Sequence, residues 1–204
     1  MSILSICLLT GILHYKYFEF PIKIFFYCIL FAFIVEWFGF YSLYLSSDKR
    51  INSLIYAIYN PLEFTIIGLY FYYIVNAKKT KKLFILLIIL VVSIEVTSTI
   101  LKFSMFKTLM IAFFFSSILS LVYFKQLLDS DVNVVKNPNF WIVTGILFFN
   151  AGFFFLSGFV SYLSQKDLEL ARKLFSINHL LNIIYYSLVA YGFICQRRLA
   201  KSSS

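Results

Sequence analysis

Three glutamates and one histidine are the residues of this chain best suited to chemistry, because each falls within a long apolar segment. Glu36 lies in FIVEWFGF, Glu63 in NPLEF, Glu95 in VSIEVTST and His179 in SINHLLN. A charge at the centre of a bilayer costs about 2.5–3.5 kcal/mol on insertion scales, so such side chains are usually retained for function. Carboxylates and an imidazole in this setting could bind a cationic or polar ligand, or relay protons.

Two other interpretations of these residues remain open at the level of sequence. Protonated glutamates can hydrogen-bond across helices and hold a bundle together without any ligand. A zinc or manganese site would also use carboxylates and a histidine, but no short-range ligand spacing supports one. We therefore predict neither a metal nor a cofactor.

The elements that must position these residues are membrane helices. The 204-residue chain is 61% hydrophobic and 13% charged, whereas soluble domains are about 45–50% apolar and about 25% charged. A soluble fold of this size has no interior large enough for so much apolar surface. The apolar runs are also uninterrupted, unlike the alternating strands of a β-barrel. We expect an all-α integral membrane bundle in contact with the lipid bilayer.

Seven segments are predicted to cross the membrane, and each of the last six is near the roughly 20 residues that a span requires. The first is short and would reach across only if tilted, so six spans is the alternative. The chain forms one transmembrane domain over 1–204, with 196–204 as a short cytoplasmic tail. No removable signal peptide is predicted. The predicted helices are about 1–17, 22–45, 53–75, 83–101, 103–124, 140–163 and 174–195.

The distribution of charge orients the bundle and excludes a nucleic-acid partner. The net charge is +9, but the basic residues are scattered in short clusters between apolar runs. Eleven of the 18 basic residues fall on the side that carries 78–82 and the C-terminus. Basic loops stay in the cytoplasm, so we expect the C-terminus there. The three cysteines stand singly and form neither a disulfide framework nor a zinc motif.

Depth and helical face predict that the polar residues converge. At about 1.5 Å per residue, all three glutamates lie roughly 9–15 Å below the outer surface. Tyr56, Asn60, Glu63 and Tyr70 share one face of their helix, and such a stripe must face the bundle interior, because lipid offers no hydrogen-bond partner. Pro61 should kink this helix beside the site. The predicted ligand-binding residues of an outward-facing pocket are Glu36, Asn60, Glu63, Glu95, Asn178, His179 and Asn182.

The whole chain resembles the small heptahelical sensor modules that bacteria join to, or encode beside, histidine kinases. The likeness is one of architecture and of phrases such as FWIVTGILFF and HLLNIIYY. It implies ligand sensing in the outer half and signal relay to a cytoplasmic partner. This chain carries no kinase or other output domain.

A second, local resemblance covers about forty residues. NPLEF, preceded one helix earlier by VEWFGF, is similar to the Pro-Leu-Glu-Glu helix of the small membrane lycopene cyclases, whose paired acids protonate a polyene. This resemblance implies that Glu63 is the catalytic acid and Glu36 its partner. Phe64 stands where that motif has its second glutamate, so the defining pair is incomplete.

The sequence favours a ligand-sensing or signal-relaying protein of a prokaryotic cytoplasmic membrane over an enzyme. Its ligand would be small or lipophilic. An isoprenoid or carotenoid cyclase is the alternative, and a proton-coupled transporter is the third possibility. The helices' inner halves are nearly devoid of ionisable groups, which disfavours transport. The oligomeric state stays open.

Overall fold

The computed structural model describes residues 2–44, 49–101, 105–130 and 133–202, without the side chains of 43, 44, 49, 50 and 105–107. Within these ranges the chain is all-α, as predicted. The α-helices are α1 (Ser2–His14), α2 (Phe20–Tyr44), α3 (Lys49–Ile74), α4 (Lys78–Ile100), α5 (Met105–Leu128), α6 (Pro138–Leu163), α7 (Leu168–Phe175) and α8 (Ile177–Ser202). Two 3-10 turns, η1 (Tyr15–Tyr17) and η2 (Val134–Lys136), precede α2 and α6.

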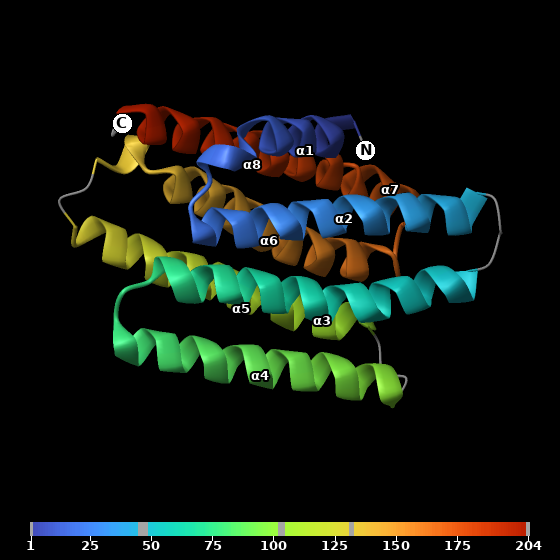
Figure 1. Cartoon of the computed structure of the whole chain (residues 1–204). Helices are drawn as coiled ribbons and strands as arrows, with labels where there is room; N and C mark the ends of the chain where they lie inside the picture. The colour runs from blue at the N-terminus through green and yellow to red at the C-terminus, as the bar shows by residue number, and fades with distance from the viewer. Residues whose placement is uncertain (1, 45–48, 102–104, 131–132, 203–204) are drawn as a thin grey trace.

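Six helices in the described residues are long and apolar enough to cross a membrane, so the protein is a multi-pass membrane protein. The prediction that 1–17 forms a seventh span is not confirmed. Helix α1 has 13 residues and is therefore about 20 Å long, less than the roughly 30 Å of hydrocarbon. In Figure 1 it lies beside α8 and covers only part of the length of that helix.

Two further segments differ from prediction. Residues 196–202, expected in the tail, continue α8 to Ser202. The connection after α6 contains α7, where Asp167 caps the helix by accepting a hydrogen bond from the Leu170 backbone N–H at 3.0 Å. Helix α7 is amphipathic and eight residues long, which suits a helix lying in the membrane interface.

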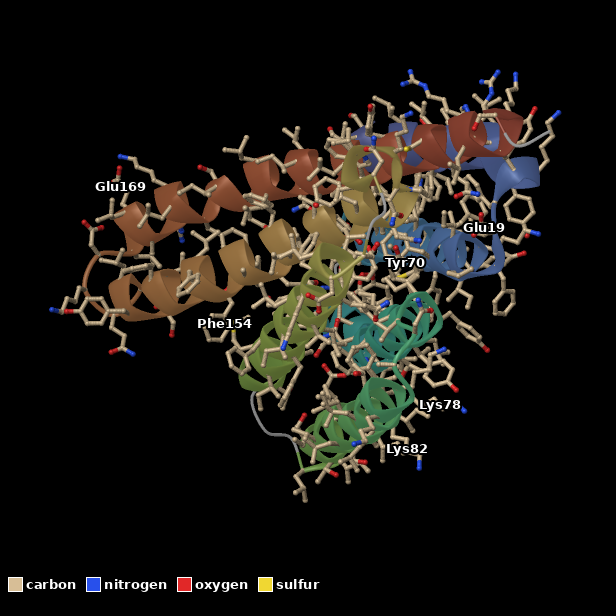
Figure 2. The ribbon with its side chains drawn as sticks, turned by 90° about the vertical axis from the view of Figure 1, so that its left-hand side faces the viewer. Glu19, Tyr70, Lys78, Lys82, Phe154 and Glu169 are labelled. Atoms are coloured by element: carbon tan, nitrogen blue, oxygen red, sulfur yellow. The ribbon has the colours of Figure 1, made fainter. Side chains whose placement is uncertain are left out.

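The long helices run antiparallel to their neighbours along the chain (Figure 1). The start of α2, the basic start of α4, the end of α5 and the C-terminus all lie at one end of the bundle, on the left of Figure 1. We call this the basic end. Figure 2 shows Lys78 and Lys82 on the periphery there and Tyr70 in the middle of the bundle.

Helices α6 and α8 form a close pair because small residues occupy their contact. A Cβ atom on Gly192 would lie 2.7 Å from Ile142 Cγ1 and 3.1 Å from the Pro138 carbonyl oxygen. A Cβ atom on Gly145 would lie 3.2 Å from the Tyr185 carbonyl oxygen. Glycine at both positions lets the two backbones approach, as is common in membrane bundles.

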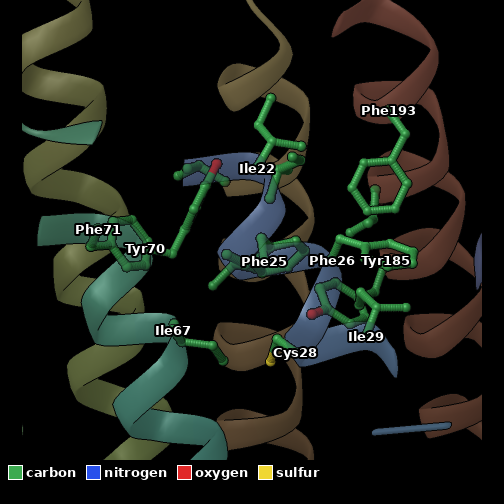
Figure 3. Packing of buried hydrophobic residues seen from close by; sticks show 14 of the residues in the cluster. Ile22, Phe25, Phe26, Cys28, Ile29, Ile67, Tyr70, Phe71, Tyr185 and Phe193 are labelled. Atoms are coloured by element: carbon green, nitrogen blue, oxygen red, sulfur yellow. The ribbon is translucent and has the colours of Figure 1, made fainter. Parts of the chain in front are cut away.

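The apolar core is aromatic and lies toward the basic end. Phe25 of α2, Tyr70 and Phe71 of α3, and Phe193 of α8 are fully buried. Figure 3 shows the α2 side chains between those of α3 and α8. The Phe25 and Tyr70 rings have centroids 5.0 Å apart, a favourable aromatic spacing.

Helix α1 is held to this core by polar contacts at its end. His14 Nδ1 lies 2.7 Å from the Thr10 carbonyl oxygen, and His14 Nε2 lies 3.2 Å from Arg197 Nη1. Gln196 Nε2 donates to the carbonyl oxygen of Tyr17 at 3.3 Å and to Glu19 Oε1 at 3.2 Å. These contacts join α1 and the following turn to the last turns of α8.

Candidate functional site

A cavity of about 270 Å³ lies inside the bundle, between α2, α3, α5, α6 and α8. The segments that line it come from the part of the bundle away from the basic end. Its polar lining residues are Glu36, Tyr56, Tyr59, Asn60, Glu63, Ser116, Asn150, Asn178, Asn182, Tyr185 and Tyr186. Its apolar lining residues are Phe64, Ile67, Leu109, Ala112, Phe113, Ile146, Phe149 and Phe153.

Helix α3 supplies one wall, including the NPLEF segment. Tyr56, Asn60 and Glu63 are spaced by four and three residues and share one face of the helix, and Tyr59 lies one turn before Glu63. The helix continues through Pro61, and the Thr65 hydroxyl donates to the Pro61 carbonyl oxygen at 2.7 Å.

Glu63 is the polar centre of this wall. The Tyr59 hydroxyl donates a hydrogen bond of 2.6 Å to Glu63 Oε1. The carboxyl groups of Glu36 and Glu95 lie within electrostatic range of Glu63. Tyr185 and Tyr186 of α8 also lie within electrostatic range of Glu63.

Glu36 lines the cavity from α2, across from α3. Tyr56 of α3 lies within electrostatic range of its carboxylate and lines the same cavity. Unlike Glu63, which is half-buried, Glu36 is exposed, so the cavity is open on this side. The two carboxylates that the cyclase resemblance pairs therefore do face one cavity.

Glu95 does not line this cavity, although its side chain is only 4% exposed. It lies on α4, which packs against α3 and α5. Both of its carboxylate oxygens are without a hydrogen-bond partner among the described residues. The Ser98 and Thr99 hydroxyls donate to its backbone carbonyl oxygen instead, at 2.8 and 3.0 Å.

The α8 residues of the predicted site divide into two groups. Asn178 and Asn182 line the cavity, and Asn182 Nδ2 donates to the Asn178 carbonyl oxygen at 2.8 Å and to Asn178 Oδ1 at 3.2 Å. His179 is exposed and is not among the lining residues. One residue along a helix is a rotation of about 100°, which carries His179 away from the face of Asn178.

Several lining residues were not among the predicted ligand-binding residues. Tyr59 precedes Glu63 by four residues, so the helical period could have indicated it. Asn150 is 4% exposed on α6, and its amide within an apolar run is a signal of the same kind as the glutamates. Ser116 on α5 gave no comparable signal, because serine is common in membrane helices.

The floor of the cavity is the aromatic core. Ile67, Ile146 and Tyr185 line the cavity and also belong to the core cluster. One turn below Ile67, the buried Tyr70 donates a hydrogen bond of 2.9 Å to Asn139 Oδ1 at the start of α6. The core therefore separates the cavity from the basic end.

A small hydrogen-bond network continues from Tyr70 to that end. Asn137 caps α6 by accepting from the Asn139 backbone N–H at 3.0 Å, and its Nδ2 donates to the Tyr123 hydroxyl at 3.3 Å. The network thus joins α3, α5 and α6 where the connection between α5 and α6 meets the bundle.

The arrangement suits binding of a small polar molecule more than metal chemistry. Across the described part of the chain, no three His, Cys, Asp or Glu residues are placed to hold a metal ion. The cavity combines two carboxylates with hydroxyl and amide groups and with aromatic rings. Compared with models of protein families, with curated proteins and with solved structures, the chain has no match.

Proposed function

We propose that this protein binds a small ligand in its bundle cavity and relays the occupancy of that cavity to a cytoplasmic partner. The observation that carries the proposal is the cavity itself, where polar side chains from five helices meet inside an apolar bundle. Polar groups are costly in such an interior unless they have partners. The resemblance to heptahelical sensor modules of the prokaryotic cytoplasmic membrane supports the same function.

Ligand binding would be relayed through the contacts between the cavity and the basic end. Ile67 lines the cavity, and Tyr70 follows one turn later on α3, with its hydroxyl on Asn139. A ligand that shifts α3 or α8 would therefore move the start of α6 and the connection before it. Packed cores convert small shifts at a ligand site into discrete rearrangements.

A cyclase-like enzyme is the second candidate, because Glu36 and Glu63 face the same aromatic-walled cavity. Glu63 would then protonate the substrate, with Glu36 as its partner. The cavity volume favours the ligand-binding function. At about 270 Å³ it is slightly smaller than drug-sized sites, which run from roughly 300 to 1,000 Å³. A carotenoid-length polyene would not fit within it.

Occupancy is tested by native mass spectrometry of the protein extracted from its membranes. We expect a bound small molecule on the wild-type protein and its loss in Ala112→Phe, since Ala112 lines the cavity and is 4% exposed. Gly158→Phe is the control, because nothing lies within 4 Å of a Cβ atom there. Melting temperatures of all three proteins identify any misfolded variant. Identical spectra from folded wild type and Ala112→Phe would contradict ligand binding.

The relay from the cavity to a partner is tested separately by photo-cross-linking in cells. Benzoylphenylalanine replaces Lys79 or Ser130, which are exposed at the basic end. We expect a protein adduct whose yield changes when Glu63→Gln is introduced. The same substitution on the exposed α7, Glu169→Gln, should leave the yield unchanged. If the adduct yield does not change in Glu63→Gln, the partner does not respond to the cavity, and the proposed relay is wrong.

A further inference from the structure

The charge of the cavity restricts the chemistry of its occupant. Glu36 and Glu63 both contribute carboxylates, whereas its lining holds no lysine, arginine or histidine among the residues described. Charges interact strongly where water is scarce, because the surrounding dielectric constant is low. The site therefore favours a positive ligand and opposes an anion.

Four tyrosines add to this preference. Tyr56 and Tyr59 come from α3, and Tyr185 and Tyr186 come from α8. The Tyr185 and Tyr186 ring centroids are 4.8 Å apart and the Tyr56 and Tyr59 centroids are 6.2 Å apart. The face of an aromatic ring attracts an organic cation, and the attraction is stronger where the cation is desolvated.

The tyrosines and carboxylates are also coupled to each other. Tyr59 donates to Glu63 at 2.6 Å, and Tyr56 lies within electrostatic range of Glu36 in the same cavity. The hydrogen bond holds Glu63 next to an aromatic ring. A cation beside Glu63 would meet a negative oxygen and a ring face together, as in sites that bind ammonium groups.

Part of the cavity lining is aromatic and apolar, and it suits a short hydrophobic substituent. Phe113, Phe149 and Phe153 form this part, and the Phe149 ring is stacked against Tyr185 with centroids 5.2 Å apart. A bare calcium or magnesium ion requires about six or more oxygen ligands, more than two carboxylates on separate helices provide. The occupant is accordingly organic and amphipathic.

We infer that the cavity binds a small organic cation, namely an amine or quaternary ammonium compound with a short apolar or aromatic group. The ammonium group would lie between Glu63 and Glu36, among the tyrosines, and the apolar group would contact the phenylalanines. This inference rests on the proposed function only in that both require the cavity to hold a ligand.

The test compares 2-phenylethylammonium with 2-phenylethanol, a neutral compound of similar shape, by calorimetric titration of the full chain in lipid nanodiscs. We expect the cation to bind at least about tenfold more tightly than the alcohol, which corresponds to about 1.4 kcal/mol. Glu63→Gln and Glu36→Gln should each lose most of this advantage while the unliganded melting temperature stays unchanged. Glu169→Gln, on a residue whose side chain is 79% exposed, should bind like wild type.

Three results would overturn the inference. They are equal binding of the cation and the alcohol, retention of cation binding in both glutamine variants, and no binding of either compound to wild type. If any of these occurs while Ala112→Phe still removes a co-purifying molecule, the ligand is not an organic cation but the proposed function stands. If Ala112→Phe also has no effect, both proposals fail.

Discussion

At the scale of single residues, the hydrogen bond between Tyr59 and Glu63 is the most specific contact of the site. A tyrosine hydroxyl that donates at 2.6 Å satisfies one carboxylate oxygen on a wall built from apolar helices. The contact is local, since the two residues are one helical turn apart. It therefore requires no residue from another helix.

Tyr59→Phe removes the hydroxyl and keeps the ring. We expect the folded protein to lose about 1–3 kcal/mol of stability, because a carboxylate oxygen loses its donor in a poorly hydrated place. The measurement is the thermal or denaturant midpoint in detergent. Tyr73→Phe, on an exposed tyrosine of the same helix, should change stability little. A Tyr59→Phe protein as stable as wild type would show that the hydrogen bond has no structural role.

Glu95 poses the opposite case, a buried carboxyl group with no hydrogen-bond partner among the described residues. Burial without a partner is unfavourable by about 1–3 kcal/mol. We therefore predict that Glu95→Met, of similar size, raises the melting temperature. Glu169→Met on the exposed surface of α7 is the control and should have almost no effect. A destabilised Glu95→Met protein would instead indicate that Glu95 holds the helices together, as the structural interpretation of the glutamates proposed.

At the scale of helices, α6 and α8 form the most closely packed pair, and glycines determine how near they come. The cavity depends on this pair, since Asn150 and Phe149 on α6 and Asn182 and Tyr185 on α8 all line it, and the Phe149 and Tyr185 rings are stacked. Any change in the separation of the two helices would therefore alter both stability and the site.

Gly192→Leu tests this packing. The added side chain would begin 2.7 Å from Ile142 Cγ1 and 3.1 Å from a backbone oxygen, so the helices must separate. Overpacking of this kind costs about 1–3 kcal/mol. Gly158→Leu places the same side chain on α6 where no atom lies within 4 Å of the Cβ position. We expect a lower melting temperature for the first variant only, and equal values for both would refute close packing at Gly192.

At the scale of the whole molecule, the antiparallel helices gather the basic loops and the C-terminus at one end (Figure 1). By the positive-inside rule we expect this end to face the cytoplasm. The cavity would then lie toward the outer side, as expected for a protein that senses an external compound.

Cysteine labelling of sealed cells checks this orientation after Cys7, Cys28 and Cys195 are replaced. Ser130, Ser164 and Ser202 are all exposed, and serine-to-cysteine is a small change at each. An impermeant maleimide should label Ser164→Cys, at the end opposite the basic loops, but neither Ser130→Cys nor Ser202→Cys. Labelling of the two basic-end positions with none at Ser164 would reverse the orientation.

The sequence by itself determined the all-α membrane class and the local faces of the helices. Uninterrupted apolar runs cannot be buried by a soluble fold of this size, and the helical period alone places Asn60 with Glu63 and Asn178 with Asn182. Those four residues do line one cavity. Local spacing is reliable here because backbone hydrogen bonds must be satisfied within each helix in lipid.

Only the tertiary structure decided which helices surround the cavity and that Glu95 and His179 do not line it. It also decided where α1 ends, and the resulting 13 residues are too few to span the hydrocarbon as a straight helix. The reason is that lipid is as apolar as a bundle interior, so hydrophobicity does not mark the buried face of a membrane helix. Phe25 is fully buried and Phe155 is 65% exposed, yet both are phenylalanines within apolar runs. Helix rotation and neighbour order follow instead from close contacts such as those at Gly145 and Gly192, which depend on residues far apart in the chain.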